Sequence, residues 1–193
     1  MFRKLTLLAA VALVASTFTV QPMFGKGKSS NRFVDTDDYK SGDYDKGIIE
    51  DYSNLVEGDG VEWVYVAPGV HLADYKIKVD QFKNKSDVTS NSMMKSLEQT
   101  LNESLARNAS KSPKGTLTAD GAVYWAERSS EGKRWIPYAG GHLAQAGVGV
   151  EVILRDSNGN IVAEIRHSGR EGDRVETAAE EVADDIAGYI SEH

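Results

Sequence analysis

The stretch that decides the fold is VGVEVILRDSNGNIVAEIRH, from Val148 to His167. Apolar residues alternate with other residues from Val148 to Leu154, which is the period of a strand with one buried face. The turn sequence DSNGN follows, and Asn-Gly is typical of the two-residue type I′ turn of a β-hairpin. Ile161 to His167 is then the returning strand, so the stretch predicts an antiparallel hairpin.

Two amphipathic helices are expected on either side of this hairpin in the sequence. Asp173 and Glu176 have the spacing of a capping box, which begins a helix that runs nearly to the C-terminus. A second apolar stripe at three- and four-residue steps predicts a helix from about Asp87 to Asn108, with Ser86 or Asp87 as its N-cap. The two stripes consist of Met94, Leu97, Leu101 and Leu105 in the earlier helix, and Val175, Ala179, Val182, Ile186, Tyr189 and Ile190 in the later one.

Three further strands complete the predicted sheet. Val61 to Ala67 is β-branched and aromatic, and Tyr75 to Phe82 alternates with one exposed face. Leu117 to Ala126 places Leu117, Ala119, Val123 and Trp125 on one face. The order is β-β-α-β-β-β-α, which predicts an α/β (α+β) two-layer sandwich with a mixed five-stranded sheet and both helices on one face. The helix between the second and third strands allows a parallel crossover.

The N-terminus has the pattern of a secretory signal peptide. Arg3 and Lys4 are followed by a mainly apolar run from Leu5 to Val20, as in an n-region and an h-region. The alternative is an uncleaved N-terminal anchor. The run is short for that role, because a membrane-spanning helix needs about 20 residues. We expect residues 1–25 to be the signal peptide, and the protein to be periplasmic or in the cell envelope.

The segment after the signal peptide has a different composition. Residues 26–47 read KGKSSNRFVDTDDYKSGDYDKG, with many charges and few apolar side chains. Such a segment cannot offset its ordering entropy, which predicts a flexible polar tether. Residues 48–193 are then expected to form a single globular α/β domain.

Composition and motifs exclude several classes of function. A net charge of −7 argues against nucleic-acid binding, and the absence of cysteine excludes disulfides and thiolate chemistry. No histidine pair has metal-binding spacing, no G-x-S-x-G motif occurs, and the glycines from Gly140 to Gly149 lead into a strand rather than a helix, unlike a phosphate loop. We therefore predict no catalytic residues, no metal site and no cofactor.

Two parts of the chain resemble known families. GIIEDYSNL (Gly47 to Leu55) and VYVAPGVHLADYKIKV (Val64 to Val79) resemble the opening of a bacterial family of envelope lipoproteins, catalogued as domain of unknown function number thirty-three thirteen. GGHLAQAGVGVEVILRDSNGNIVAEI (Gly140 to Ile165), with the final helix, is similar to a neighbouring family, number forty-four ten. The resemblance implies a secreted bacterial envelope protein without established activity or catalytic residues. The chain lacks the lipidated cysteine, so the resemblance does not extend to outer-membrane anchoring.

One long connection carries the candidate binding residues. From Arg128 to Gly147 the chain runs 20 residues between two strands, whereas hairpin loops usually have about 2–5. Its candidate binding residues are Arg134, Trp135, Tyr138 and His142. A basic residue beside two aromatic ones could stack on a sugar or anchor a protein; alternatively, Trp135 and Tyr138 fold back to cover the sheet.

These features lead to two hypotheses for the function. The favoured one is a non-catalytic exported cell-envelope module that binds a protein or glycan partner, with no nucleic acid, and with the membrane only through an uncleaved N-terminal anchor. The alternative is a hydrolase or transferase that acts on an envelope substrate through an unrecognised active site.

Overall fold

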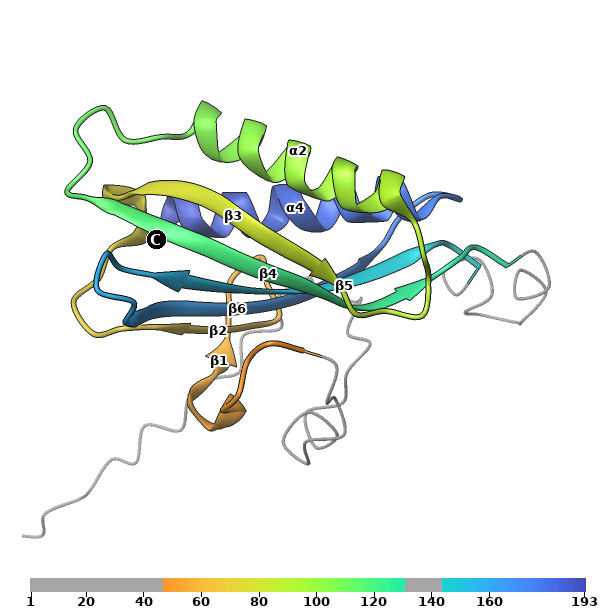
Figure 1. Ribbon diagram of the computed structural model, residues 1–193, viewed down its shortest axis with the longest axis horizontal. Helices are drawn as coiled ribbons and strands as arrows, with labels where there is room; N and C mark the ends of the chain where they lie inside the picture. Colours follow the sequence, from red (N-terminus) through yellow and green to blue (C-terminus); the bar gives the residue numbers. More distant parts are fainter. Residues whose placement is uncertain (1–46, 131–143) are drawn as a thin grey trace, which may run out of the picture.

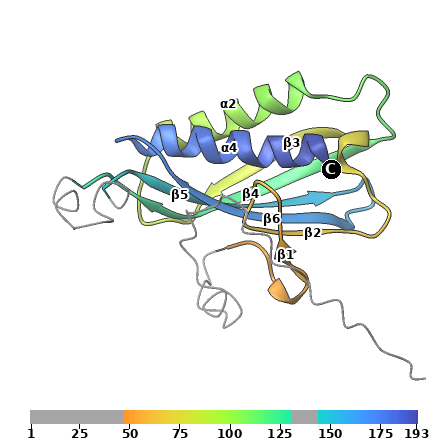
Figure 2. The same cartoon turned by 180° about the vertical axis from the view of Figure 1, so that it is seen from behind.

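The computed structural model describes residues 47–130 and 144–193. In this part of the chain, a six-stranded mixed sheet carries two α-helices side by side on one face (Figures 1 and 2). The strands are β1 (Val56–Glu57), β2 (Trp63–Val66), β3 (Lys76–Asn84), β4 (Thr116–Glu127), β5 (Gly147–Arg155) and β6 (Ile161–Arg170). The helices are α2 (Asn91–Arg107) and α4 (Val175–Glu192), with short 3-10 helices η1 (Tyr52–Asn54) and η2 (Leu72–Asp74).

The strands lie in the order β1-β2-β6-β5-β4-β3. β3 pairs with β4 in parallel, as expected for a crossover through α2, and the other neighbours are antiparallel. The α+β class and the placement of both helices on one face are confirmed. The prediction of five strands is wrong, because β1 has only two residues and is too short to show a period in the sequence.

The hairpin between β5 and β6 forms, but with a different turn. Gly159 N donates to Asp156 O at 3.0 Å, which places Ser157 and Asn158 at the centre of the turn. Gly159 follows them with φ +85°, so the loop has three residues and ends in a left-handed glycine. The predicted two-residue type I′ turn is therefore wrong. The carboxylate of Asp156 stabilises the longer loop, since it accepts hydrogen bonds from the amides of Asn158 and Asn160.

Both helices begin at residues other than those predicted. α2 is capped by Ser90, whose Oγ accepts a hydrogen bond from Met93 N at 3.2 Å. Ser86 instead hydrogen-bonds to Asn84 in the loop after β3. Arg174 is the N-cap of α4 and makes no side-chain capping bond, so the expected capping box does not form.

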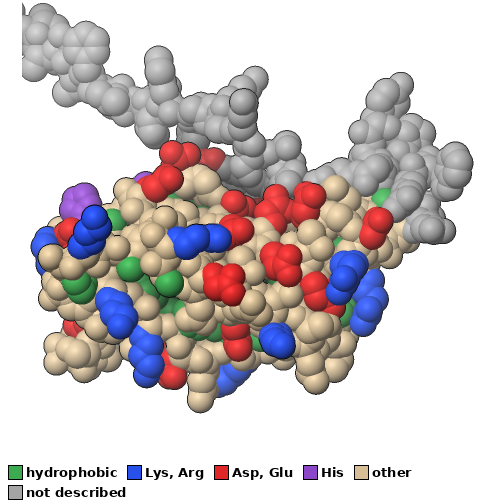
Figure 3. Space-filling view, turned by 90° about the horizontal axis from the view of Figure 1, so that it is seen from above, with side chains coloured by type: hydrophobic (Ala, Val, Ile, Leu, Met, Phe, Trp, Pro, Cys, Tyr) green, Lys and Arg blue, Asp and Glu red, His purple; other side chains and the backbone are tan. Residues whose placement is uncertain are grey.

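The main core lies between the sheet and the helices. Leu97 and Leu101 of α2 and Val182 and Ile186 of α4 are almost completely buried against the apolar residues of β4, β5 and β6. Figure 3 shows the outer surface of the helix layer, where acidic and basic side chains are interspersed. Within the described residues, no helix is long and apolar enough to cross a membrane.

A bulge in β4 changes which side chains face this core. The pairing with β5 shifts register between Val123 and Trp125. Val123 and Ala126 consequently pack toward the helices, whereas Trp125 stacks with Arg170. The expectation that Trp125 shares a face with Leu117 and Val123 is wrong, because one extra residue at the bulge reverses the alternation.

Candidate functional site

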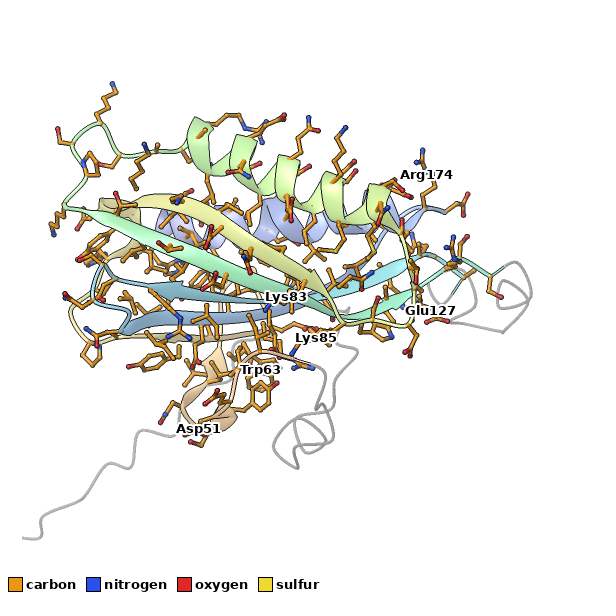
Figure 4. All side chains as sticks on the ribbon, in the orientation of Figure 1. Asp51, Trp63, Lys83, Lys85, Glu127 and Arg174 are labelled. Atoms are coloured by element: carbon orange, nitrogen blue, oxygen red, sulfur yellow. The ribbon has the colours of Figure 1, made fainter. Side chains whose placement is uncertain are left out.

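The face of the sheet away from the helices is covered near its centre by the N-terminal part of the described chain. Residues 47–55 lie across this face, below the sheet in the orientation of Figure 1. A second apolar cluster forms there from Ile49, Leu55, Trp63 and Ile153. Figure 4 shows Asp51 and Trp63 on this side, opposite α2 and α4. The strands at the centre of the sheet are therefore buried on both faces, and not exposed on one as the alternation suggested.

A cluster of charged and aromatic residues lies beneath this covering segment. Glu151 of β5 and Arg166 of β6 are opposite each other in the pairing of the two strands, and neither exposes any side-chain surface to solvent. They form an ion pair between Glu151 Oε1 and Arg166 Nη1. With Tyr52 from η1 and Tyr124 from β4, we call these four residues the clasp.

The Glu151 carboxylate fixes the covering segment to the sheet. Its Oε2 accepts hydrogen bonds from the backbone amides of Ile48 at 2.5 Å and Ile49 at 3.0 Å. Its Oε1 accepts a hydrogen bond from Tyr52 Oη at 2.8 Å, in addition to the one from Arg166. The carboxylate thus receives four donors, and three of them come from the segment that it holds.

The Arg166 guanidinium lies between two aromatic rings. Its Cζ is 3.8 Å from the centroid of the Tyr124 ring and 5.4 Å from that of Tyr52, so the positive charge faces π-systems as well as a carboxylate. The Tyr124 ring fits because residue 149 is glycine, where a Cβ would lie 2.5 Å from Tyr124 Cζ. An alanine at this position would collide with the ring.

The electrostatics of the clasp favour a fixed protonation state. Burial raises the pKa of Tyr52, and the negative charge of Glu151 raises it further. Burial likewise raises the pKa of Tyr124. Both phenols therefore keep their protons near neutral pH, and Tyr52 acts as a hydrogen-bond donor to the carboxylate.

Further polar side chains extend the network along the same face of β6. Ser168 Oγ donates to the carboxylate of Glu62, with both oxygens at 3.1 Å. Arg170 donates to Glu127 and to Gln145 O, the latter at 3.0 Å. Alternate residues of β6 thus supply a row of buried polar side chains. Ser168 and Arg170 each find their hydrogen-bond partners on neighbouring segments.

The predicted binding residues Arg134, Trp135, Tyr138 and His142 lie outside the described residues, and their role stays a prediction. The described residues contain both ends of the connection that carries them. Ser130 N donates to Ala144 O at 2.9 Å, which joins the two ends. Next to this junction the Arg170 guanidinium stacks on the Trp125 ring, with Cζ 4.9 Å from the ring centroid.

The histidines that the structure describes have structural contacts. His71 Nδ1 lies 2.9 Å from His193 O, and the His193 ring stacks on Tyr189 at 4.1 Å between centroids. His167 Nε2 lies 3.0 Å from Asp185 Oδ2, which joins β6 to α4. Over residues 47–130 and 144–193, no group of three or more His, Asp or Glu is arranged to hold a metal ion.

Two depressions of the surface lie away from the clasp. One, of about 340 Å³, is at the N-terminus of α4 and is lined by Arg128, Ser129, Asp173, Arg174, Val175 and Glu176. The other, of about 300 Å³, lies between the C-terminal part of α2, η2 and β3. In the first depression, Ser129 Oγ donates a hydrogen bond to Asp173 O at 2.8 Å.

Sequence reasoning missed the clasp. The available signal was Glu151 within the otherwise apolar strand β5, and the alternation of Glu164, Arg166, Ser168 and Arg170 in β6. That alternation identifies a distinct face of the sheet, but it is equally typical of a face exposed to solvent. The covering segment shows no periodicity that would have predicted its position on the sheet.

No family model matches the chain, and no curated protein matches it. Membership of the two families of unknown function is therefore not confirmed. Among solved structures, a PelC dodecamer from Paraburkholderia phytofirmans is 17% identical with a TM-score of 0.46, over 66% of this chain and 95% of that one. A candidate lipoprotein from Caulobacter crescentus CB15 is 17% identical with a TM-score of 0.34, over 63% and 91%.

A PDZ domain protein from Parabacteroides distasonis is 13% identical with a TM-score of 0.35, over 67% of this chain and 34% of that one. At these identities and TM-scores, the similarities carry no argument about the function of this chain.

Proposed function

We propose that this chain is an exported, non-catalytic module of the bacterial cell envelope that binds a protein or glycan partner. Export is supported by the N-terminal sequence, where Arg3 and Lys4 precede the apolar run from Leu5 to Val20. This is the pattern of a secretory signal peptide.

The non-catalytic part of the proposal rests on the burial and the hydrogen bonding of the Glu151 carboxylate. A general acid or base needs access to a substrate and a proton that can move. The Glu151 carboxylate is instead fully buried and accepts hydrogen bonds from Ile48, Ile49, Tyr52 and Arg166. All of these donors belong to the protein itself, which favours a structural role for the buried ion pair of Glu151 and Arg166.

The partner is proposed to bind at the connection between β4 and β5, through Arg134, Trp135, Tyr138 and His142. Aromatic side chains with a neighbouring arginine are frequent hot spots for proteins, and they also stack on sugars. The bond between Ser130 N and Ala144 O supports this proposal, because it holds the two ends of the connection together beside the sheet.

Affinity capture tests the proposal. The purified protein, Trp135→Ala/Tyr138→Ala and the control Val56→Ala are immobilised and exposed separately to envelope proteins and to envelope glycans of the source bacterium. Val56 is a suitable control because its side chain is 62% exposed on β1. We expect the double variant to lose the captured partner with an unchanged melting temperature, while Val56→Ala keeps both.

Two results would contradict the proposal. A large fall in melting temperature with undiminished capture would mean that the two aromatic residues belong to the core. Turnover of an envelope substrate by the purified protein would instead support the hydrolase or transferase alternative.

A further inference from the structure

A row of lysines lies on one face of the edge strand β3. Ile77, Val79 and Phe82 pack against the core under the helices. Since side chains alternate along a strand, Lys76 and Lys78 point to the opposite face. The register shift between Val79 and Phe82 keeps Lys83 on that same face. With Lys85, which follows the strand, we call these residues the lysine face; all four are exposed.

The lysine face is basic on a protein that is acidic overall. Its neighbours include two carboxylates, Asp80 on β3 and Asp120 on β4, and the Arg155 Nε atom lies 3.9 Å from Asp120 Oδ2. Four lysines and one arginine therefore meet two aspartates on this surface. Within the described ranges, no carboxylate forms an ion pair with Lys76, Lys78 or Lys83.

The complementary charge lies in the sequence just before the described part of the chain. Of the five aspartates in residues 35–45, Asp35, Asp37, Asp43 and Asp45 are at odd-numbered positions, and Asp38 is at an even-numbered one. In an extended chain, residues two apart share a face, so these four carboxylates would face the same way. The lysines of this segment, Lys40 and Lys46, are at even-numbered positions and would face the other way.

The start of the described chain lies within reach of the lysine face. Lys85 Nζ donates to Gly47 O at 2.6 Å, and Figure 4 shows Lys83 and Lys85 at the same end of β3. Ten extended residues before Gly47 would span about 33 Å, which is close to the ~30 Å length of a nine-residue strand. The acidic residues can thus reach every lysine of the row.

We propose that residues 35–45 bind to the lysine face of β3, with their aspartates against Lys76, Lys78 and Lys83. Because the segment is joined to the domain at Gly47, its effective concentration at this surface is in the millimolar range expected for short linkers, so weak ion pairs are enough for occupancy. The segment would then cover the lysine face and exclude other anionic ligands from it. This inference does not depend on the proposed function.

Spin labelling tests the contact. The natural chain has no cysteine, so Gly42→Cys gives a single site for a nitroxide label in the full chain, purified as the cell produces it. We expect the amide signals of β3 and of the adjacent residues of β4 to lose intensity, and those at the solvent side of α2 to keep it. The loss should largely disappear at about 1 M salt, where the Debye length is about 3 Å.

Charge variants separate this contact from general proximity. In Lys76→Glu/Lys78→Glu the intensity loss along β3 should disappear, and adding Asp35→Lys/Asp37→Lys should restore it. The matched control Lys95→Glu/Lys111→Glu has the same change in net charge on exposed residues of the helix side, and should keep the loss. Unaffected β3 signals in the labelled parent protein would overturn the proposal, as would an intensity loss that survives reversal of Lys76 and Lys78.

Discussion

At the scale of single residues, the buried pair of Glu151 and Arg166 determines how the second face of the sheet is used. Burial of two charges costs desolvation free energy, which only good geometry and additional hydrogen bonds can offset. Here Glu151 receives those bonds from Ile48, Ile49 and Tyr52, and Arg166 stacks on Tyr124. The pair therefore ties its own stability to that of the covering segment.

Glu151→Gln should destabilise the protein strongly. The substitution keeps the shape of the side chain but leaves the charge of Arg166 buried without its carboxylate, and removing one partner of a buried ion pair costs about 3–5 kcal/mol. Denaturant unfolding measures this cost. The control is Asp80→Asn, which neutralises an exposed carboxylate and should change stability by less than about 0.5 kcal/mol. Equal effects of the two substitutions would show that the clasp does not stabilise the fold.

At the scale of elements, the two helices are joined by polar contacts as well as by their apolar stripes. Glu176 in the first turn of α4 accepts a hydrogen bond from Ser92 in the first turn of α2. Ser96 donates to Glu180 at 2.9 Å one turn further along. The Glu176 carboxylate is thus shared between Ser92 of α2 and Arg174, the N-cap of its own helix, whose Nε lies 3.4 Å from Glu176 Oε2. These contacts take the place of the expected capping box.

Glu176→Gln should make the stability of the helix pair less sensitive to acid. The hydrogen bond from Ser92 lowers the pKa of Glu176 below its ordinary value of 4.5. A lowered folded-state pKa contributes stability that is present above the unfolded-state pKa and is lost as pH falls through the folded-state pKa. The melting temperature of the variant should therefore lie below that of the wild type near neutral pH and converge with it at about pH 2. A difference that persists unchanged at about pH 2 would contradict this.

Leu101→Ala tests the packing of α2 on the sheet. Leu101 is 1% exposed, and truncation of a buried leucine costs about 2–5 kcal/mol. Lys95→Ala on the exposed side of the same helix is the matched control, and should change stability by less than about 0.5 kcal/mol. Both changes are measured by denaturant unfolding, and a cost below about 0.5 kcal/mol for Leu101→Ala would place the stripe on the wrong face.

At the scale of the whole molecule, the layer beneath the helices was predictable from the sequence, and the layer on the other face was not. Each long strand and both helices show their periods directly, since one face of each packs on a single continuous core. The second face depends on contacts between residues about 100 positions apart, such as Ile49 with Glu151. A short covering segment has no period of its own, so local sequence patterns cannot reveal it.

The candidate site was less predictable from the sequence than the fold was. The residues selected for chemistry were aromatic and basic side chains in a long connection, and they lie outside the described residues. The sequence pattern singles out neither Glu151 nor Arg166, the residues that the structure brings together, because alternation alone does not show whether the polar face is covered. Their strand positions were predicted correctly, but their burial was not.

Amide hydrogen exchange at Ile48 and Ile49 tests the central claim most directly, namely that the clasp fastens residues 47–55 to the sheet. Both amides donate to the buried carboxylate of Glu151, so we predict exchange far slower than in an unstructured chain. In Glu151→Gln, exchange at these two amides should accelerate more than exchange in the centre of β5 and β6. Exchange of both amides at the unprotected rate in the wild type, with β5 and β6 still protected, would contradict the account.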